Sequence, residues 1–223
     1  GFLSFACSVD HKQIYAGDKG PNTGGMGAYS PSFILSSEQF ARMNEVANRI
    51  VRALLAQGRE FRGCLYLGLM ITPEGKIYIL ECNARPGDPE WQVLMMRLAQ
   101  PLSPILMDAA TGSLKQVPLA FTDDVAINIV LASRPYPDKP VVGEAITGIE
   151  KAKQIPGVQI FHAGTALQGC GNYITAGGRV LNICATGKTL QEAQVAALKA
   201  ADLIDWKNKT LRRDIGWRVL QKA

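Results

Sequence analysis

Three polar side chains follow directly on an apolar run in the first half of the chain. The run Ile77–Leu80 leads into Glu81, Asn83 and Arg85. Because alternate residues of a strand point to the same face, we expect the Glu81 carboxylate and the Asn83 amide to lie side by side. Such oxygen ligands suit Mg²⁺ or Mn²⁺. Arg85 adds a planar cation that fits phosphate or carboxylate, so the three residues together indicate a site for metal and phosphate.

The same alternation predicts the faces of the whole strand. It places Glu81 and Asn83 on one face together with Ile77 and Ile79, and it places Cys82 on the opposite, core-facing side. A simpler interpretation also fits these residues: the strand ends in polar groups, and Glu81 pairs with a nearby arginine. Spacing alone leaves both interpretations open.

A glycine-rich stretch near the start of the chain is the second candidate for chemistry. Residues 17–29 read GDKGPNTGGMGAY. Backbone N–H groups in such a loop can approach an anion closely, because glycine adds no side chain in the way. The stretch matches neither a Walker P-loop nor a dinucleotide-binding fingerprint. A long structural loop is the alternative interpretation.

The elements around these candidates can be read from hydrophobic periodicity. Residues 36–57 are predicted to form a helix with one buried apolar stripe, because Ser36 and Gln39 fit a capping box and Gly58 fits a helix stop. Residues 64–71 and 76–82 are predicted to form two strands joined by a turn at 72–75, and their apolar character predicts cover on both faces.

Shorter elements complete this first region. Residues 2–6 are expected to form a short strand. Asp88–Pro89 is a helix-start signal for a helix ending near Leu98, and Asp88 could serve simply as its cap. A further helix is expected to begin at Ser103 and to end at Gly112.

The pattern changes near residue 117 toward short strands divided by glycine and proline. Residues 125–131, 159–162, 172–175 and 179–185 are predicted strands, with a hairpin-like corner at 176–179. A capping box at Thr189 opens a final helix that runs to about Ile204. We therefore predict an α+β fold of two domains, 1–116 and 117–223, with an antiparallel sheet flanked by helices followed by a small β-rich domain.

Composition narrows the classes of protein that this chain can belong to. With 47% hydrophobic and 19% charged residues, a packed core is feasible. No apolar run approaches the ~20 residues that span a bilayer, and no signal peptide is visible. The net charge of +5 is spread without long blocks, which favours small anions over nucleic acid as ligands. Five scattered cysteines are expected to be reduced, mostly buried thiols of a cytoplasmic protein.

Several stretches together resemble one known family. The resemblance rests on DHKQIYAGDKGPNTGGMGAYSP (Asp10–Pro31), LECNARPGDPEWQ (Leu80–Gln92), FHAGT (Phe161–Thr165), TAGGRVLNICATG (Thr175–Gly187) and RRDIG (Arg212–Gly216). These stretches are similar, in the same order, to the phosphoribosylamine–glycine ligases, also called glycinamide ribonucleotide synthetases. The stretch GPNTGGMGAYSP is the most specific of them.

The resemblance implies an ATP-grasp fold and a reaction of purine biosynthesis. Enzymes of this family join glycine to 5-phosphoribosylamine, and ATP becomes ADP and phosphate. The implied route phosphorylates the glycine carboxylate to glycyl phosphate, which the amine then attacks. The implied cofactors are ATP and Mg²⁺ or Mn²⁺, and the other partners are small molecules, without nucleic acid or membrane.

The resemblance also implies roles for individual residues. Glu81 and Asn83 match the metal ligands of the family, and Arg85 matches an arginine near the transferred phosphate. The remaining positions that the resemblance assigns are His11 and Lys12, close to the nucleotide phosphates, and Asn22, Thr23, Gly24, Gly25 and Asp88, close to the substrates.

Departures from the family pattern qualify these expectations. The family usually has Phe where Cys82 and Pro86 stand, and Pro86 could re-aim Arg85 because a residue before proline prefers an extended conformation. The family also carries an N-terminal domain and a nucleotide-gripping lobe before the DHK stretch. We therefore expect this chain to correspond to the C-terminal half, to bind ATP weakly and to lack turnover alone. The alternatives are another ATP-grasp carboxylate–amine ligase, and a non-catalytic remnant that binds partners or anions.

Overall fold

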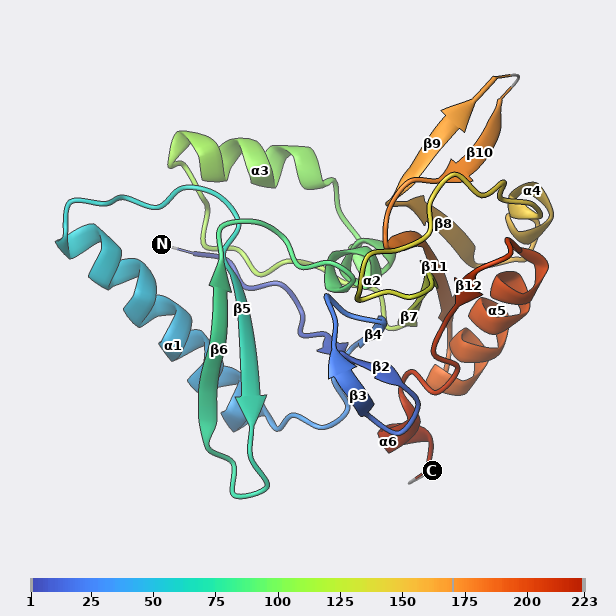
Figure 1. Cartoon of the computed structure of the whole chain (residues 1–223). Coiled ribbons are helices and arrows are strands. Elements are labelled where there is room, and N and C mark those ends of the chain that lie inside the picture. Colours follow the sequence, from blue (N-terminus) through green and yellow to red (C-terminus); the bar gives the residue numbers. More distant parts are fainter. Residues whose placement is uncertain (1, 170, 222–223) are drawn as a thin grey trace. The chain divides into compact units, whose positions relative to one another are not determined.

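The computed structural model describes residues 2–169 and 171–221. Cys170, one of the predicted reduced thiols, lies outside the described residues. Contacts within the chain define two compact units (Figure 1). Unit 1 contains residues 2–5, 33–87 and 98–121, and unit 2 contains residues 6–32, 88–97, 122–169 and 171–221. Both units are discontinuous, so this division differs from the predicted split between residues 116 and 117.

Unit 2 is built on an antiparallel sheet, which explains the difference. Its strands lie in the order β1-β4-β7-β11-β8, and the short strand β12 also pairs with β7. Two strands from the first 30 residues, β1 and β4, thus join a sheet whose other members come after residue 124. The strands are β1 (Val9–Asp10), β4 (Gly27–Ser30), β7 (Val125–Ser133), β8 (Val158–His162), β11 (Arg179–Gly187) and β12 (Lys209–Thr210).

The central strand β7 is covered on both faces, and all nine of its residues are buried. Ile127 and Ile129 belong to the main hydrophobic cluster, which includes residues of helix α5 (Leu190–Leu203). Ala126 points to the opposite face and packs against Val93 of helix α2 (Glu90–Arg97). Because side chains alternate along a strand, α5 and α2 cover opposite faces of the sheet.

Smaller elements surround this sheet. The hairpin of β2 (Gln13–Tyr15) and β3 (Lys19–Asn22) carries part of the glycine-rich stretch. The predicted corner at 176–179 is not a hairpin between its flanking strands, because β10 (Asn172–Thr175) pairs with β9 (Thr165–Gln168) and β11 pairs with β7 and β8. Two helical turns complete the unit: α4 (Ile149–Ala152) and α6 (Trp217–Leu220).

Unit 1 contains the predicted long helix and hairpin. Helix α1 (Ser37–Ala56) begins at the expected capping box, in which the side chains of Ser36 and Gln39 each accept a backbone N–H of the other residue. Strands β5 (Tyr66–Ile71) and β6 (Ile77–Asn83) pair as predicted, and α3 (Leu102–Thr111) ends at Gly112. The predicted strand at 2–6 is wrong, because the described residues there form no ladder.

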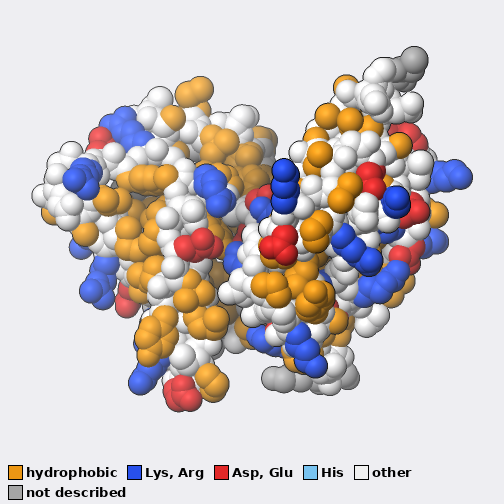
Figure 2. All heavy atoms as spheres, in the orientation of Figure 1, with side chains coloured by type: hydrophobic (Ala, Val, Ile, Leu, Met, Phe, Trp, Pro, Cys, Tyr) orange, Lys and Arg blue, Asp and Glu red, His pale blue; other side chains and the backbone are white. Residues whose placement is uncertain are grey.

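Burial in unit 1 differs from the prediction. Among the described residues, every hydrophobic side chain that is fully buried belongs to unit 2. The apolar stripe of α1 is only half-buried, and neither face of the β5–β6 pair is closed. Figure 2 shows hydrophobic side chains at the surface over this region. The predicted cover on both faces is therefore wrong for this chain, because the described residues of unit 1 supply only two strands and two long helices.

The cysteines and the helices bear on two further expectations. Cys184 is buried, Cys7 and Cys64 are half-buried, and Cys82 is exposed, so the expected core position of Cys82 is wrong. All four are free thiols, and burial raises the pKa of Cys7 to about 11. In the part of the chain that the structure describes, no helix has the length and hydropathy to cross a membrane.

The core of unit 2 predicts how the fold responds to truncation of a side chain. Ile183 of β11 is fully buried between its cross-strand neighbours Ile129 and Ile160. Ile183→Ala should lower the free energy of unfolding by about 3 kcal/mol, because it removes buried methyl groups and leaves a cavity. Chemical denaturation measures this change. The matched control is Val195→Ala on the exposed side of α5, where we expect a change below about 0.5 kcal/mol; equal losses at both positions would contradict the assignment of the core.

Candidate functional site

The predicted metal pair lies at the end of β6 in unit 1. Glu81 is opposite Gly68 on β5 and Asn83 is opposite Tyr66, with no shift of register between the two pairs. The two side chains therefore share a face, as predicted. A Cβ atom on Gly68 would lie 2.6 Å from Cγ of Glu81, so the glycine leaves room for the carboxylate.

The rest of the predicted face is wrong. The register shifts between Gly68 and Leu69, so that Leu69 is opposite Ile79 and Leu80 has no cross-strand partner of its own. This extra residue reverses the alternation. Ile77 and Ile79 consequently lie on the face away from Glu81.

The oxygen ligands fit a hard divalent cation, and the pair alone does not complete a coordination shell. No cluster of three or more His, Cys, Asp or Glu side chains able to hold a metal occurs among the described residues. The buried Nδ2 atom of Asn83 has no hydrogen-bond partner there either, so no described side chain fixes this amide through its nitrogen. Mg²⁺ is commonly held by one or two protein ligands together with water and substrate phosphate, and Glu81 with Asn83 fits that pattern.

Arg85 is exposed and turns back toward its own backbone. Its Nη1 atom donates to the carbonyl oxygen of Pro86 at 2.9 Å. This bond uses one of five N–H donors, so the guanidinium keeps donors for an anion.

In unit 2, the glycine-rich stretch does not present an anion cradle. The N–H of Thr23 donates to Lys12 O at 2.7 Å, and that of Gly24 donates to the Tyr136 hydroxyl at 2.8 Å. The N–H of Gly25 donates to Oγ1 of Thr23 at 3.0 Å, and Met26 N–H donates to a backbone carbonyl. Because these donors already bind protein oxygens, they are not free for an anion, and the structure supports the structural interpretation of this loop. We call the surface formed by Thr23, Gly24 and Gly25 the wall.

Lys12 and Asn22 lie beside this wall. The Nζ atom of Lys12 is 2.6 Å from Asp10 Oδ2 and 3.9 Å from Glu90 Oε1. Burial and the Glu90 charge raise the pKa of Asp10 to about 7, and Lys12 opposes this shift. Asn22 is exposed at the end of β3, where it pairs with Gln13.

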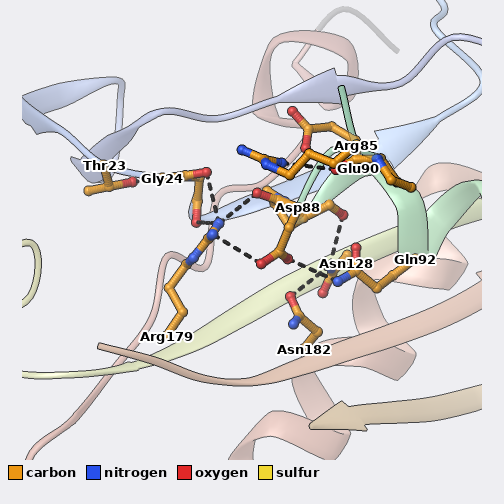
Figure 3. A network of polar contacts seen from close by, with 12 residues as sticks. Thr23, Gly24, Arg85, Asp88, Glu90, Gln92, Asn128, Arg179 and Asn182 are labelled. Carbon is orange, nitrogen blue, oxygen red and sulfur yellow. Dashed lines mark hydrogen bonds and ion pairs between the residues drawn. The ribbon is translucent and has the colours of Figure 1, made fainter. Parts of the chain in front are cut away.

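Asp88 and Arg179 form the centre of the polar network in Figure 3. Arg179 Nη2 lies 3.0 Å from Asp88 Oδ2, and Nη1 donates to Asp88 O at 2.7 Å and to Gly24 O at 2.8 Å. Nε2 of Gln92 donates to the other carboxylate oxygen of Asp88 at 2.9 Å. Both carboxylate oxygens of Asp88 therefore have side-chain partners. Sequence reasoning missed the role of Arg179, although it lies in the quoted stretch TAGGRVLNICATG.

Two buried asparagines hold the turn before α2. Nδ2 of Asn128 on β7 donates to Pro89 O at 3.0 Å and to Asn182 Oδ1 on β11 at 2.9 Å. Buried amides stay in place only when they are hydrogen-bonded, so this pair ties the sheet to the Asp88–Pro89 turn.

His11 is a buried side chain with a backbone partner. It is only 5% exposed, and its Nε2 atom accepts the Gly216 N–H at 3.1 Å. Burial, assisted by the nearby Arg212 charge, lowers the pKa of His11 to about 4. A neutral, buried imidazole whose acceptor nitrogen is engaged supports a structural role.

The C-terminal RRDIG stretch explains why His11 is held in this way. Arg212 is fully buried and forms ion pairs with Asp18 at 3.0 Å and with Asp214 at 2.8 Å. Its Nη1 atom also donates to Gln13 O, and Gly17 N–H donates to Asp214. Residues near the end of the chain therefore anchor the β2–β3 hairpin.

These contacts predict how stability depends on pH. The pKa of His11 falls from 6.5 to about 4 on folding, so the unfolded chain takes up the proton first. The contribution of His11 to the free energy of unfolding is fully present above pH 6.5. It is lost as the pH falls toward 4, by at most about 3 kcal/mol. His11→Gln keeps an acceptor for Gly216 without this titration. Denaturation of both proteins between pH 8 and 4 should show the wild type losing more stability than the variant.

The comparison of the two proteins isolates His11. The raised pKa of Asp10 has the opposite sign, because its protonation favours the folded state as the pH falls through 7, and it is common to both proteins. A difference in stability that stays constant with pH would contradict the buried, neutral state of His11.

Two models of one protein family match this chain. Residues 2–91 match the ATP-grasp (A) domain of phosphoribosylglycinamide synthetase, and residues 126–218 match the C domain of the same family. The chain is 46% identical over 221 residues to the phosphoribosylamine–glycine ligase of Mesorhizobium japonicum. This chain belongs to the phosphoribosylglycinamide synthetase family. A further family member, the chloroplastic phosphoribosylamine–glycine ligase of Arabidopsis thaliana, is 44% identical over 216 residues.

A solved structure of the family supports the fold. The phosphoribosylamine–glycine ligase of Thermotoga maritima matches with a TM-score of 0.84 and 36% identity, over 96% of this chain and 52% of that protein. N5-carboxyaminoimidazole ribonucleotide synthetase from Thermotoga maritima, at 16% identity and a TM-score of 0.59, shares the fold alone. The α+β, ATP-grasp fold class predicted from the sequence is confirmed. This chain spans about half the length of the curated relatives that it matches, 51% for the Mesorhizobium japonicum protein.

Proposed function

We propose that this chain supplies one part of an ATP-dependent ligase that joins glycine to 5-phosphoribosylamine and yields glycinamide ribonucleotide, ADP and phosphate. The observation that carries the proposal is the shared face of Glu81 and Asn83 at the end of β6, in a chain of the phosphoribosylglycinamide synthetase family. The reaction needs two bond changes. A glycine carboxylate oxygen attacks the γ-phosphorus of ATP as the bond to the β,γ-bridging oxygen breaks and ADP leaves. The amine then attacks the carbonyl carbon of glycyl phosphate as phosphate leaves, and the new amide nitrogen loses one proton.

The metal pair serves the first of these changes. Glu81 and Asn83 would hold a divalent cation, Mg²⁺ or Mn²⁺, through their side-chain oxygens. When bound, such an ion neutralises charge on the phosphate oxygens. The Arg85 guanidinium would donate to the transferred phosphoryl group, where its fork matches the oxygens and its charge opposes the charge that develops.

The wall in unit 2 serves the substrates. The side chain of Asp88 is 39% exposed, and among the described residues each carboxylate oxygen accepts one polar contact, so lone pairs remain for an amino group. Thr23, Gly24 and Gly25 form the rigid surface beside it. Lys12 would add positive charge for an anionic substrate, while the buried His11 side chain binds the Gly216 backbone.

The metal assignment is tested in the ligase with its remaining half restored. A coupled assay of ADP production with glycine and 5-phosphoribosylamine should show activity that requires all three substrates. Glu81→Gln combined with Asn83→Ala should lower kcat by about 10²–10³-fold, because the charge on the transferred phosphoryl group is no longer neutralised. Circular dichroism should stay unchanged.

The matched control is Glu74→Gln in the exposed turn between β5 and β6. It makes the same chemical change on the same hairpin and should leave kcat within about twofold. Near wild-type activity of the double variant would show that the metal lies elsewhere. Absence of glycine-dependent ADP production by the wild type would reject the ligase proposal itself.

A further inference from the structure

Two side chains from later in the chain bind the backbone of Gly24 in the glycine-rich stretch. Arg179, at the start of β11, binds the Gly24 carbonyl oxygen at 2.8 Å, and the Tyr136 hydroxyl accepts the Gly24 N–H at 2.8 Å. We call these two residues the latch. Both ends of one glycine are thus fixed by residues more than 100 positions away in the sequence, and all of these groups belong to unit 2.

Arg179 joins this glycine to Asp88. One guanidinium nitrogen donates both to Gly24 O and to Asp88 O, and the other lies 3.0 Å from the Asp88 carboxylate. Only a planar fork with several N–H donors can reach these three oxygens together. The Arg179 side chain is 21% exposed, so water screens these contacts only partly.

Tyr136 is held by packing as well as by its hydroxyl. Its ring packs with Ile14, Met26 and Ala132. A Cβ atom on Gly178 would lie 2.4 Å from Cδ2 of Tyr136, so the ring occupies the space that a side chain there would need.

A side chain at Gly24 would press against both residues of the latch. A Cβ atom there would lie 3.0 Å from Cζ of Arg179 and 3.1 Å from the Tyr136 hydroxyl oxygen. Hydrogen bonds to the latch therefore hold both the N–H and the carbonyl group of Gly24 in place. The same guanidinium and the Gln92 side chain bind the Asp88 carboxylate, so this carboxylate is fixed relative to Gly24.

We propose that Tyr136 and Arg179 are positioning residues, which align the Gly24 peptide and the Asp88 carboxylate to receive the amino group of glycine. The inference rests on the proposed ligase function. Asp88 is the exposed acceptor of the network, and an ammonium group is the cationic donor that such a carboxylate recognises. A small error in its position weakens binding of this substrate, while the nucleotide contacts on other residues stay intact.

The kinetic test uses the ligase with its remaining half restored. Arg179→Lys keeps the charge and removes the fork. It should raise the KM for glycine about tenfold, while the KM for ATP stays within about twofold and kcat within about threefold. Tyr136→Phe should raise the KM for glycine by about threefold, because one acceptor is lost. The matched controls are Arg213→Lys, in an exposed pair with Asp202, and Tyr173→Phe on β10; both should leave all constants unchanged.

Two kinetic outcomes would overturn the inference. Unchanged KM for glycine in Arg179→Lys would show that the latch does not serve this substrate. An equal rise of both KM values with a fall in kcat would indicate general loss of structure. If the wild type shows no glycine-dependent ADP production, the ligase proposal and the glycine role fail together.

Amide hydrogen exchange in the full 223-residue chain tests the latch without any activity. Tyr136→Phe should speed exchange at the Gly24 N–H about tenfold, because its acceptor is gone. Exchange at Gly25, whose N–H binds Thr23 Oγ1, should change far less and serves as the internal reference. Equal exchange at Gly24 in both proteins would overturn the latch, whatever the kinetics show.

Discussion

The pairing of β4 with β7 is the contact on which the rest of unit 2 depends. It places Gly27–Ser30 along a strand that is buried on both faces, and β1 follows on the outer edge. The glycine-rich stretch that precedes β4 is thereby brought beside β11, where Arg179 can reach it. Neighbouring strands lie about 4.8 Å apart, so side chains from distant parts of the sequence meet at the same end of β7. The polar network around Asp88 is a consequence of this pairing.

The two units differ in how they are stabilised. Unit 2 has a dry core of branched aliphatic side chains between the sheet and α5. Unit 1 has an amphipathic helix and a two-stranded ladder without a fully buried hydrophobic side chain among its described residues. A two-stranded sheet is marginally stable without further cover. The predicted metal pair thus lies on the less stabilised unit, while the wall and the latch lie on the firmly packed one.

Local patterns in the sequence predicted most elements and part of the site. The caps of α1 and α5, the turn at Gly75 and the shared face of Glu81 and Asn83 follow from interactions within a few residues. The register shift at Leu80 could not be read from alternation, because an extra residue in one strand leaves no local signal. Arg179, Tyr136 and the buried state of His11 depend on contacts across more than 100 positions, which no spacing rule reveals.

The anchor of Arg212 has a consequence for folding. The β2–β3 hairpin, at residues 13–22, acquires its buried partner only from residues 212–216, almost a whole chain length later. During synthesis, Asp18 must therefore remain hydrated until the last part of unit 2 has left the ribosome. Contacts of such long sequence separation form slowly, since the loop between them must close first. The hairpin and the adjoining glycine-rich wall are thus expected to be among the last parts of the molecule to take their final form.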